Sequence, residues 1–222
     1  MYKIETHLHT KYTSCCGRLD AEEIVSGYLS AGYHGIVITD HYNRDTFRMK
    51  RTAPDSAGAL EAFLDGYRRV KELGQRLGLA VYRGAELRFD GDGSDFLLYG
   101  WHDTLLRNPE AVMSMGLAAF APLYRADGAL MVQAHPYRSG CTPADPKLLD
   151  GVEVRNMHPG HESRNWLAKD FAVRNGLIET SGSDCHERHH LGRGGILAAG
   201  LPADDAALVR LLRSRDFQLL GT

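Results

Sequence analysis

Short apolar, β-branched runs alternate along the chain with longer segments in which apolar residues recur every three or four positions. The short runs have the length of β-strands, and the longer segments have the period of amphipathic helices. Strands are predicted at Lys3–His7, Gly35–Thr39, Leu79–Glu86, Asp95–Gly100, Ala129–Ala134, Gly151–Arg155 and Gly176–Ser181. Helices are predicted from Asp20 to Gly32, from Gly58 to Leu77, and at Glu110–Arg125, Ser163–Asn175 and Asp204–Ser214.

This alternation of strand and helix predicts a largely parallel α/β sheet. Seven or eight such units in 222 residues favour a compact TIM-like barrel, smaller than the usual ~250 residues. No linker or low-complexity stretch divides the chain, so we expect residues 1–222 to form a single domain. The basic run RDTFRMKRT at 44–52 is expected to be either a lid or a solvated loop, and the loop is preferred.

Histidines and carboxylates stand at or just after the carboxyl ends of these strands. In strand order they are His7 and His9, Asp40 and His41, Glu86, His102, His135, Glu153 (followed by the amide of Asn156), and Asp184 and His186. His7 and His9 are two positions apart, so their rings point to one face of the strand. The carboxyl ends of barrel strands share the face that carries the active site. The fold therefore predicts that these groups meet at one rim.

Several imidazoles with a few carboxylates form a ligand set for Zn²⁺, Mn²⁺ or Fe²⁺. The candidates are too many for one ion, so two or three ions are implied. Glu86 directly ends its strand and is the best candidate for a carboxylate that bridges two ions. Paired ions activate a water and neutralise a phosphoryl group in transfer. The set therefore predicts hydrolysis of phosphate esters, ahead of hydrolysis of an amide.

Composition narrows the partners and the compartment. The formal charge of -2 and the pI near 6.6 argue against long nucleic acids and membrane surfaces as partners. No apolar run is long enough for a membrane span, and the N-terminus lacks a signal-peptide pattern. Four cysteines, two of them adjacent, do not resemble a secreted disulfide framework. We expect a cytoplasmic protein with reduced thiols, and leave its oligomeric state open.

Five short motifs occur in order at the strand ends: HLH at 7–9, ITDH at 38–41, GAE at 84–86, AHP at 134–136 and GSDCH at 182–186. Together they resemble the motifs of the PHP family, the polymerase and histidinol phosphatase domain. The resemblance implies a distorted (β/α)7 barrel and a phosphoesterase with two or three metal ions. It also implies one ion at His7, His9, Glu86 and Asp184, a second at Glu86 and His135, and a third at His41 and His186. We expect Glu86, Asp184 and His186 to be the catalytic residues.

Two positions depart from the family pattern. The second ion usually has a further histidine after the fourth strand, and His102 stands there at a shorter spacing from Glu86. The third ion usually has an Asp or a His where this chain has SCCG, with Cys15 at the expected offset and Cys16 beside it. A thiolate can ligate Zn²⁺. Either a cysteine sulfur therefore maintains the third site, or the site is weakened or lost and the enzyme binds two ions. Asp40 is either a ligand or a partner that orients an imidazole.

The phosphate of a substrate needs positive charge besides the metal ions. Arg18, Arg164 and Arg193 are the candidates, because a guanidinium binds phosphate oxygens in a bidentate fork. His158 and His161, after the sixth strand, either reach the substrate or are exposed loop residues.

We therefore expect a phosphomonoesterase that acts on a small phosphorylated metabolite, such as a nucleotide or a compound like histidinol phosphate, with a metal-activated water. Three alternatives stay open. They are a phosphodiesterase or exonuclease on short nucleic acid, a metal-dependent amidohydrolase on a similar barrel, and a non-enzymatic metal-binding module.

Overall fold

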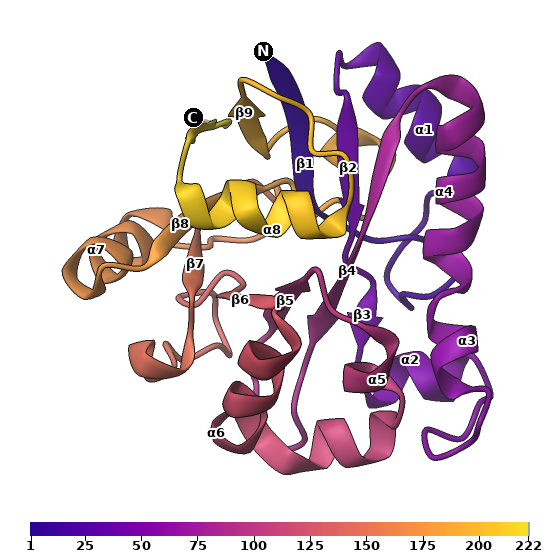
Figure 1. The fold of residues 1–222 in the computed structure, drawn as a ribbon, viewed down its shortest axis with the longest axis vertical. Helices are drawn as coiled ribbons and strands as arrows, with labels where there is room; N and C mark the ends of the chain where they lie inside the picture. The colour runs from indigo at the N-terminus through magenta and orange to yellow at the C-terminus, as the bar shows by residue number, and fades with distance from the viewer. Residues whose placement is uncertain (222) are drawn as a thin grey trace.

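A computed structural model of the chain, which describes residues 1–221, places the strands side by side in one curled sheet (Figure 1). The strands are β1 (Tyr2–Leu8), β2 (Gly35–Ile38), β3 (His41–Tyr42), β4 (Ala80–Leu87), β5 (Phe96–Tyr99), β6 (Leu130–Gln133), β7 (Gly151–Asn156), β8 (Ile178–Gly182), β9 (Ile196–Ala198) and β10 (Phe217–Leu219). Each strand predicted from the sequence is present, with its ends shifted by at most two residues. The short strands β3, β9 and β10 were not predicted.

The sheet closes into a distorted barrel. Its hydrogen-bonded order runs β1-β2-β4-β5-β6-β7-β8, and β8 then returns to the second half of β1. There the Thr6 hydroxyl donates to the Ser181 carbonyl at 2.5 Å, and the His9 amide donates to the Cys185 carbonyl at 2.9 Å. The first half of β1 pairs instead with β9, which continues to β10. The expected barrel of seven strands is confirmed.

Within the ring of seven strands, one strand runs against the others, which corrects the expectation of a parallel sheet. β5 is antiparallel to both neighbours, β4 and β6, whereas the other neighbouring strands around the ring are parallel. The amino end of β5 therefore lies at the rim where β4 and β6 end, since Phe96 pairs with Leu87 and Gln133. Asp95 precedes β5 at this rim, and the residues after β5 leave at the opposite end.

Helices cover the outside of the sheet, and α1 and α4 pack side by side along one flank (Figure 1). The helices are α1 (Ala21–Ser30), α2 (Arg44–Met49), α3 (Ala59–Phe63), α4 (Asp65–Leu77), α5 (Asp103–Leu106), α6 (Pro109–Asp127), α7 (Asn165–Asn175) and α8 (Asp205–Ser214), with 3₁₀ turns η1 (Pro146–Leu148) and η2 (Arg188–His190). None of the described helices is both long and apolar enough to span a membrane.

Three helix expectations are corrected. The helix expected from Gly58 to Leu77 is two helices, α3 and α4, that meet at Leu64. α6 bends at Gly116, whose φ of 76° and ψ of 163° are not helical. The run at 44–52 is not a loop throughout: Asn43 caps α2 by accepting from the Thr46 amide at 3.0 Å. Such a short helix buries too few side chains to show a helical period in its sequence.

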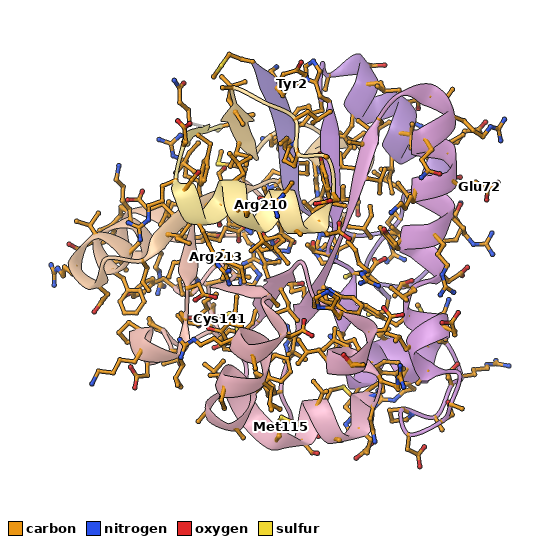
Figure 2. All side chains as sticks on the ribbon, in the orientation of Figure 1. Tyr2, Glu72, Met115, Cys141, Arg210 and Arg213 are labelled. Atoms are coloured by element: carbon orange, nitrogen blue, oxygen red, sulfur yellow. The ribbon has the colours of Figure 1, made fainter. Side chains whose placement is uncertain are left out.

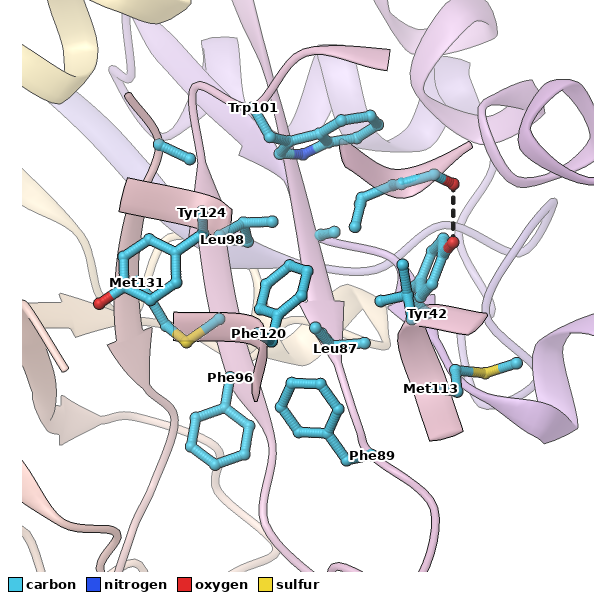
Figure 3. Packing of buried hydrophobic residues seen from close by; sticks show 14 of the residues in the cluster. Tyr42, Leu87, Phe89, Phe96, Leu98, Trp101, Met113, Phe120, Tyr124 and Met131 are labelled. Atoms are coloured by element: carbon cyan, nitrogen blue, oxygen red, sulfur yellow. Dashed lines mark hydrogen bonds between the residues drawn. The ribbon is translucent and has the colours of Figure 1, made fainter. Parts of the chain in front are cut away.

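The largest apolar cluster lies between β4, β5 and α6 (Figure 3). Phe89 packs on Phe96 and Phe120 with ring centroids 5.7 and 5.6 Å apart. At its edge the Tyr42 hydroxyl donates to the Leu106 carbonyl at 2.7 Å. This cluster holds β4 and β5 in place. It therefore fixes the residues at the rim that end β4 and those that precede β5.

α8 closes the end of the barrel opposite this rim. Leu208 and Leu212 of α8 join a cluster of residues that point into the barrel from β1, β5 and β6. Arg213, labelled in Figure 2, donates to the carbonyls of Gly128 and Ala129 just before β6. With one end filled by these apolar side chains, the polar cavity lies at the other.

We predict that Phe120→Ala lowers the free energy of unfolding by about 3–5 kcal/mol, since it empties a fully buried site of the cluster. Leu123→Ala is the matched control, because Leu123 lies on the same helix and is 46% exposed. Its effect should be within about 0.5 kcal/mol. Urea unfolding followed by circular dichroism measures both, and equal effects would contradict this packing.

Candidate metal centre

Side chains from the ends of β1, β3, β4, β6 and β8 meet at the rim of the barrel, and most of them line a cavity of about 600 Å³. The structure brings together every residue of the metal-ligand set expected from the sequence: His7, His9, His41, Glu86, His135, Asp184 and His186. Most of these side chains are fully buried, and His41 and His186 are each 13% exposed. The set forms one continuous cluster.

The spacing of the ligand atoms fits shared cations. Two ligands about 2.1 Å from one tetrahedral ion lie about 3.4 Å apart. His7 Nε2 lies 3.2 Å from Glu86 Oε1 and 3.4 Å from Asp184 Oδ1. His9 Nε2 lies 3.5 Å from Glu86 Oε2 and 3.3 Å from Asp184 Oδ1. These four side chains are arranged as ligands around one point.

Glu86 stands between this group and the remaining histidines. Its Oε1 also lies 3.2 Å from His135 Nε2, and its Oε2 lies 2.7 Å from His41 Nδ1. Each carboxylate oxygen therefore faces two imidazoles from different strands. This is the position that a bridging carboxylate requires.

The fit to a metal rests on atoms that the protein leaves without hydrogen bonds. His7 Nε2, His9 Nε2, His41 Nδ1 and Glu86 Oε2 are buried and have no hydrogen-bond partner among the described residues. Their neighbours are close, but the angles are not those of hydrogen bonds. Leaving a buried polar atom unsatisfied costs about 1–3 kcal/mol. Four such atoms directed at one region indicate that divalent cations belong there.

Hydrogen-bond acceptors set the tautomers of His7 and His186. His7 Nδ1 lies 2.9 Å from Glu153 Oε1, and His186 Nδ1 lies 2.8 Å from the Asp184 carbonyl. Both partners are acceptors, so in the neutral form of each ring Nδ1 carries the proton and Nε2 has the lone pair. That lone pair is what a metal ion requires.

His9 is oriented through a two-step hydrogen-bond chain. Its Nδ1 donates to the Ser14 hydroxyl at 3.2 Å, and this hydroxyl donates to Asp40 Oδ1 at 2.7 Å. Asp40 also accepts from the amide and the hydroxyl of Thr10. Asp40 thus points away from the cluster. Of the two expectations for Asp40, the structure favours the partner that orients an imidazole.

The charges of the cluster are strongly coupled. Burial opposes the charged form of His7, but Glu153, Asp184 and Glu86 outweigh it and raise the pKa of His7 well above its usual value. Burial and the neighbouring His186 and His41 lower the pKa of His9 well below its usual value. Burial also opposes the carboxylate of Glu86, but His41 and His7 hold its pKa well below the usual range. The carboxylates therefore stay ionised and supply negative charge for cations.

Two of the clustered residues have unusual backbones. His135 has a φ of 29° and Asp184 a φ of 49°, in the left-handed region that residues other than glycine rarely adopt. Such strained conformations concentrate at functional sites, where the surroundings hold them. Here they aim two side chains into the cavity.

The two adjacent cysteines differ. The residue Cys15 is exposed, but its thiol is partly buried, and this burial is the main cause that raises the pKa of the thiol. Cys16 lines the cavity with its sulfur 3.1 Å from His41 Nε2. Burial alone would raise the pKa of Cys16, but hydrogen bonds with His186 and His41 lower it to about 6.

The expectation for His102 is wrong. Its ring is 73% exposed and lies against Asp127, at the end of the barrel that α8 covers. The cause is the reversed direction of β5, which carries the residues after it away from the rim. The same reversal brings Asp95 into the cavity, where Arg88 binds it through two hydrogen bonds of 2.7 and 2.6 Å. Asp95 was missed because the strand was assumed to be parallel.

The expected phosphate-binding residues divide into two groups. Arg18, His158 and His161 line the cavity. Arg164 is exposed at the start of α7, and Arg193 is exposed with its Nε donating to the His189 carbonyl. Neither of these two arginines lines the cavity.

Arg138 lines the cavity and was missed. Its Nη2 donates to Asp184 Oδ2 and to Asn156 Oδ1, both at 2.7 Å. The run AHPYR, which places this arginine three positions after His135, contains the signal that would have revealed it.

The fold and the rim define the class: an α/β barrel with a candidate metal centre at the carboxyl ends of its strands. Within this class, the chain belongs to the PHP domain family, whose model matches residues 5–183. A second model, described as PHP-associated, matches residues 162–217.

Individual relatives are distant. A probable histidinol-phosphatase of Thermotoga maritima is 23% identical over 86% of this chain and 87% of its own length. A Bacteroides vulgatus two-domain protein containing a predicted PHP-like metal-dependent phosphoesterase superposes with a TM-score of 0.74 at 17% identity, over 99% of this chain and 64% of that one. The lesion-specific endonuclease PfuEndoQ of Pyrococcus furiosus gives a TM-score of 0.62 at 12% identity, over 98% and 57%. The chain thus spans less than two thirds of either structure.

We predict that Glu153→Gln weakens metal binding about 10–100-fold, because an amide in place of the carboxylate disturbs the partner of His7 Nδ1. Glu179→Gln is the matched control, since Glu179 lies on the neighbouring strand β8 and outside the cavity. Competition with a chromogenic chelator measures the affinity of each variant. Equal affinities for both would show that Glu153 does not orient a ligand.

Proposed function

We propose that this protein is a metal-dependent phosphoesterase that removes phosphate from a small phosphorylated metabolite. The observation that carries the proposal is the set of buried ligand atoms without hydrogen bonds, placed at the spacing of shared ligands. Imidazoles with carboxylates select Zn²⁺, Mn²⁺ or Fe²⁺. Such ions supply an activated water and offset the charge of the phosphoryl group.

The ligands divide among the ions as the family resemblance implies. His7, His9, Glu86 and Asp184 hold the first ion. Glu86 and His135 hold the second, and His41 and His186 the third. Glu86, Asp184 and His186, which all line the cavity, are the catalytic residues of this proposal.

The open side of the cavity would hold the phosphate. Arg138 presents its guanidinium there while Asp184 and Asn156 fix its position. Arg18 is exposed at the mouth, and its guanidinium has no ion pair within residues 1–221. Both arginines therefore bind phosphate oxygens by charge-assisted hydrogen bonds.

His158 is suited to act as a neutral hydrogen-bond donor to the substrate. Burial is the main cause that lowers the pKa of His158 to about 3, so the ring is uncharged at neutral pH. Its Nδ1 accepts from the Gly160 amide at 3.1 Å, which leaves the proton on Nε2. His158 therefore offers an N–H group to a phosphate or leaving-group oxygen.

The preferred substrate is a monoester. The similarity to a probable histidinol-phosphatase and the formal charge of -2 support a small metabolite rather than a long nucleic acid. A phosphodiester in a short nucleic acid is the second candidate, because the endonuclease of P. furiosus shares this fold.

Metal removal provides the direct test of the reaction. We predict that the purified protein hydrolyses p-nitrophenyl phosphate, that dialysis against a chelator abolishes turnover, and that Zn²⁺ or Mn²⁺ restores it. Bis-p-nitrophenyl phosphate is the control substrate. Faster turnover of the diester would favour the second candidate, and no turnover of either ester by the metal-loaded protein would overturn the proposal.

Phosphate binding is tested by two arginine substitutions. We predict that Arg18→Ala raises KM for the monoester roughly tenfold with little change in kcat, since one charge-assisted contact is lost. Arg164→Ala removes the same charge outside the cavity and should leave both constants unchanged. The proposed role of Arg18 fails if both variants behave alike in steady-state kinetics.

A further inference from the structure

We propose that Cys16 is a thiolate ligand in this centre, and that with His41 and His186 it forms a third metal position that prefers thiophilic ions. This inference rests on the proposed metal centre and adds to it a sulfur ligand. Of the two cysteines that the sequence left open, it proposes the second cysteine of SCCG as the ligand.

The three side chains converge at one corner of the cavity. Cys16 Sγ lies 3.1 Å from His41 Nε2, and His186 lines the same cavity with its ring centroid 6.0 Å from that of His41. A sulfur about 2.3 Å and a nitrogen about 2.0 Å from one tetrahedral zinc lie about 3.5 Å apart. The observed separation is close to this value, so a small shift of the thiol accommodates an ion.

The imidazole of His186 is oriented for this role, and His9 lies beside it. His186 Nδ1 is committed to the Asp184 carbonyl, so its Nε2 lone pair is available. Ligand nitrogens of His9, His41 and His186 lie within 4.8 Å of one another. His9 is fully buried, and its Nε2 has no hydrogen-bond partner in the described chain. The corner thus brings three imidazoles together beside the thiol.

The loop that carries Cys16 is bonded to both histidines. On one side, the Ser14 hydroxyl accepts from the His41 amide at 2.9 Å. On the other side, the Arg18 amide donates to the His186 carbonyl at 2.9 Å. Gly17 packs so tightly that a Cβ there would lie 2.4 Å from the Thr10 carbonyl oxygen. These contacts fix the loop, and therefore the thiol, relative to both imidazoles.

Cys15 lacks all of these features. Its side chain is exposed, and Cys15 is not among the residues that line the cavity. Both cysteines are free thiols. Cys15 is therefore a natural control, because it differs from Cys16 by one position and has the same chemistry.

A thiolate changes which ions the position accepts. Soft sulfur ligands select Zn²⁺, Fe²⁺ or Co²⁺ over Mn²⁺ and Mg²⁺, which favour oxygen. Binding requires the deprotonated thiol, and its proton is released to solvent as the ion is taken up. An Asp at this position, as the family pattern usually has, would accept Mn²⁺ more readily.

Cobalt substitution tests the sulfur ligand without relying on activity. The metal-free protein is titrated with Co²⁺ while bound cobalt and the near-ultraviolet thiolate-to-cobalt charge-transfer absorption are recorded. We expect the band in the wild type and in Cys15→Ser. We expect Cys16→Ser to lose the band and one equivalent of cobalt while it keeps the remaining ions.

Two further variants complete the design. Cys141→Ser should keep the band, although Cys141 Sγ lies 3.7 Å from His135 Nδ1 and is the other thiol next to a proposed ligand. Cys16→Asp should keep the cobalt count without the band and bind Mn²⁺ more tightly than the wild type. If Cys16→Ser folds poorly, Cys16→Asp provides the test of the sulfur ligand in its place.

The outcomes separate this inference from the proposed function. Cobalt binding and phosphatase activity without a thiolate band would overturn the role of Cys16 and leave the phosphoesterase intact. A band that survives in both Cys16 variants would also overturn it. A wild type that binds no cobalt would overturn the metal centre and the sulfur ligand together.

Discussion

The structure depends on the burial of three imidazoles and one carboxylate, each of which directs an atom without a hydrogen-bond partner into the cluster. Water is excluded from these atoms, and the neighbouring groups lie at distances of 2.7–3.5 Å without hydrogen-bond geometry. Burying such groups is costly unless they are paired or coordinate metals. Divalent cations would satisfy the lone pairs and offset the carboxylate charge at once.

The surrounding fold keeps these atoms directed inward. Glu5 is fully buried on β1 and accepts from the amides of His7 and Ser183, so one carboxylate ties together the two segments that carry ligands. The Tyr28 hydroxyl donates to the same side chain at 2.9 Å. Glu153 and Asp40 orient His7 and His9 from outside the cluster. These outer carboxylates are as buried as the ligands, so the polar interior extends well beyond the cavity.

Sequence reasoning predicted the barrel and the inner ligands for a physical reason. Residues at the carboxyl ends of parallel strands share a rim, so His7, Glu86 and Asp184 could be placed together without coordinates. The assumption failed at β5, whose short apolar run contains no information on its direction. His102 was therefore placed at the wrong end, and Asp95 was overlooked. Loop residues such as Arg138 depend on turns that periodicity does not describe, and the choice between Cys15 and Cys16 required the loop geometry.

The most direct test of the central claim is the anomalous scattering of a crystal of the purified protein, measured at the absorption edges of zinc, iron and manganese. The account predicts anomalous peaks among His7, His9, Glu86 and Asp184, beside His135, and between His41 and His186. An electron-density map without peaks, in which these side chains hydrogen-bond to one another or to water, would contradict it.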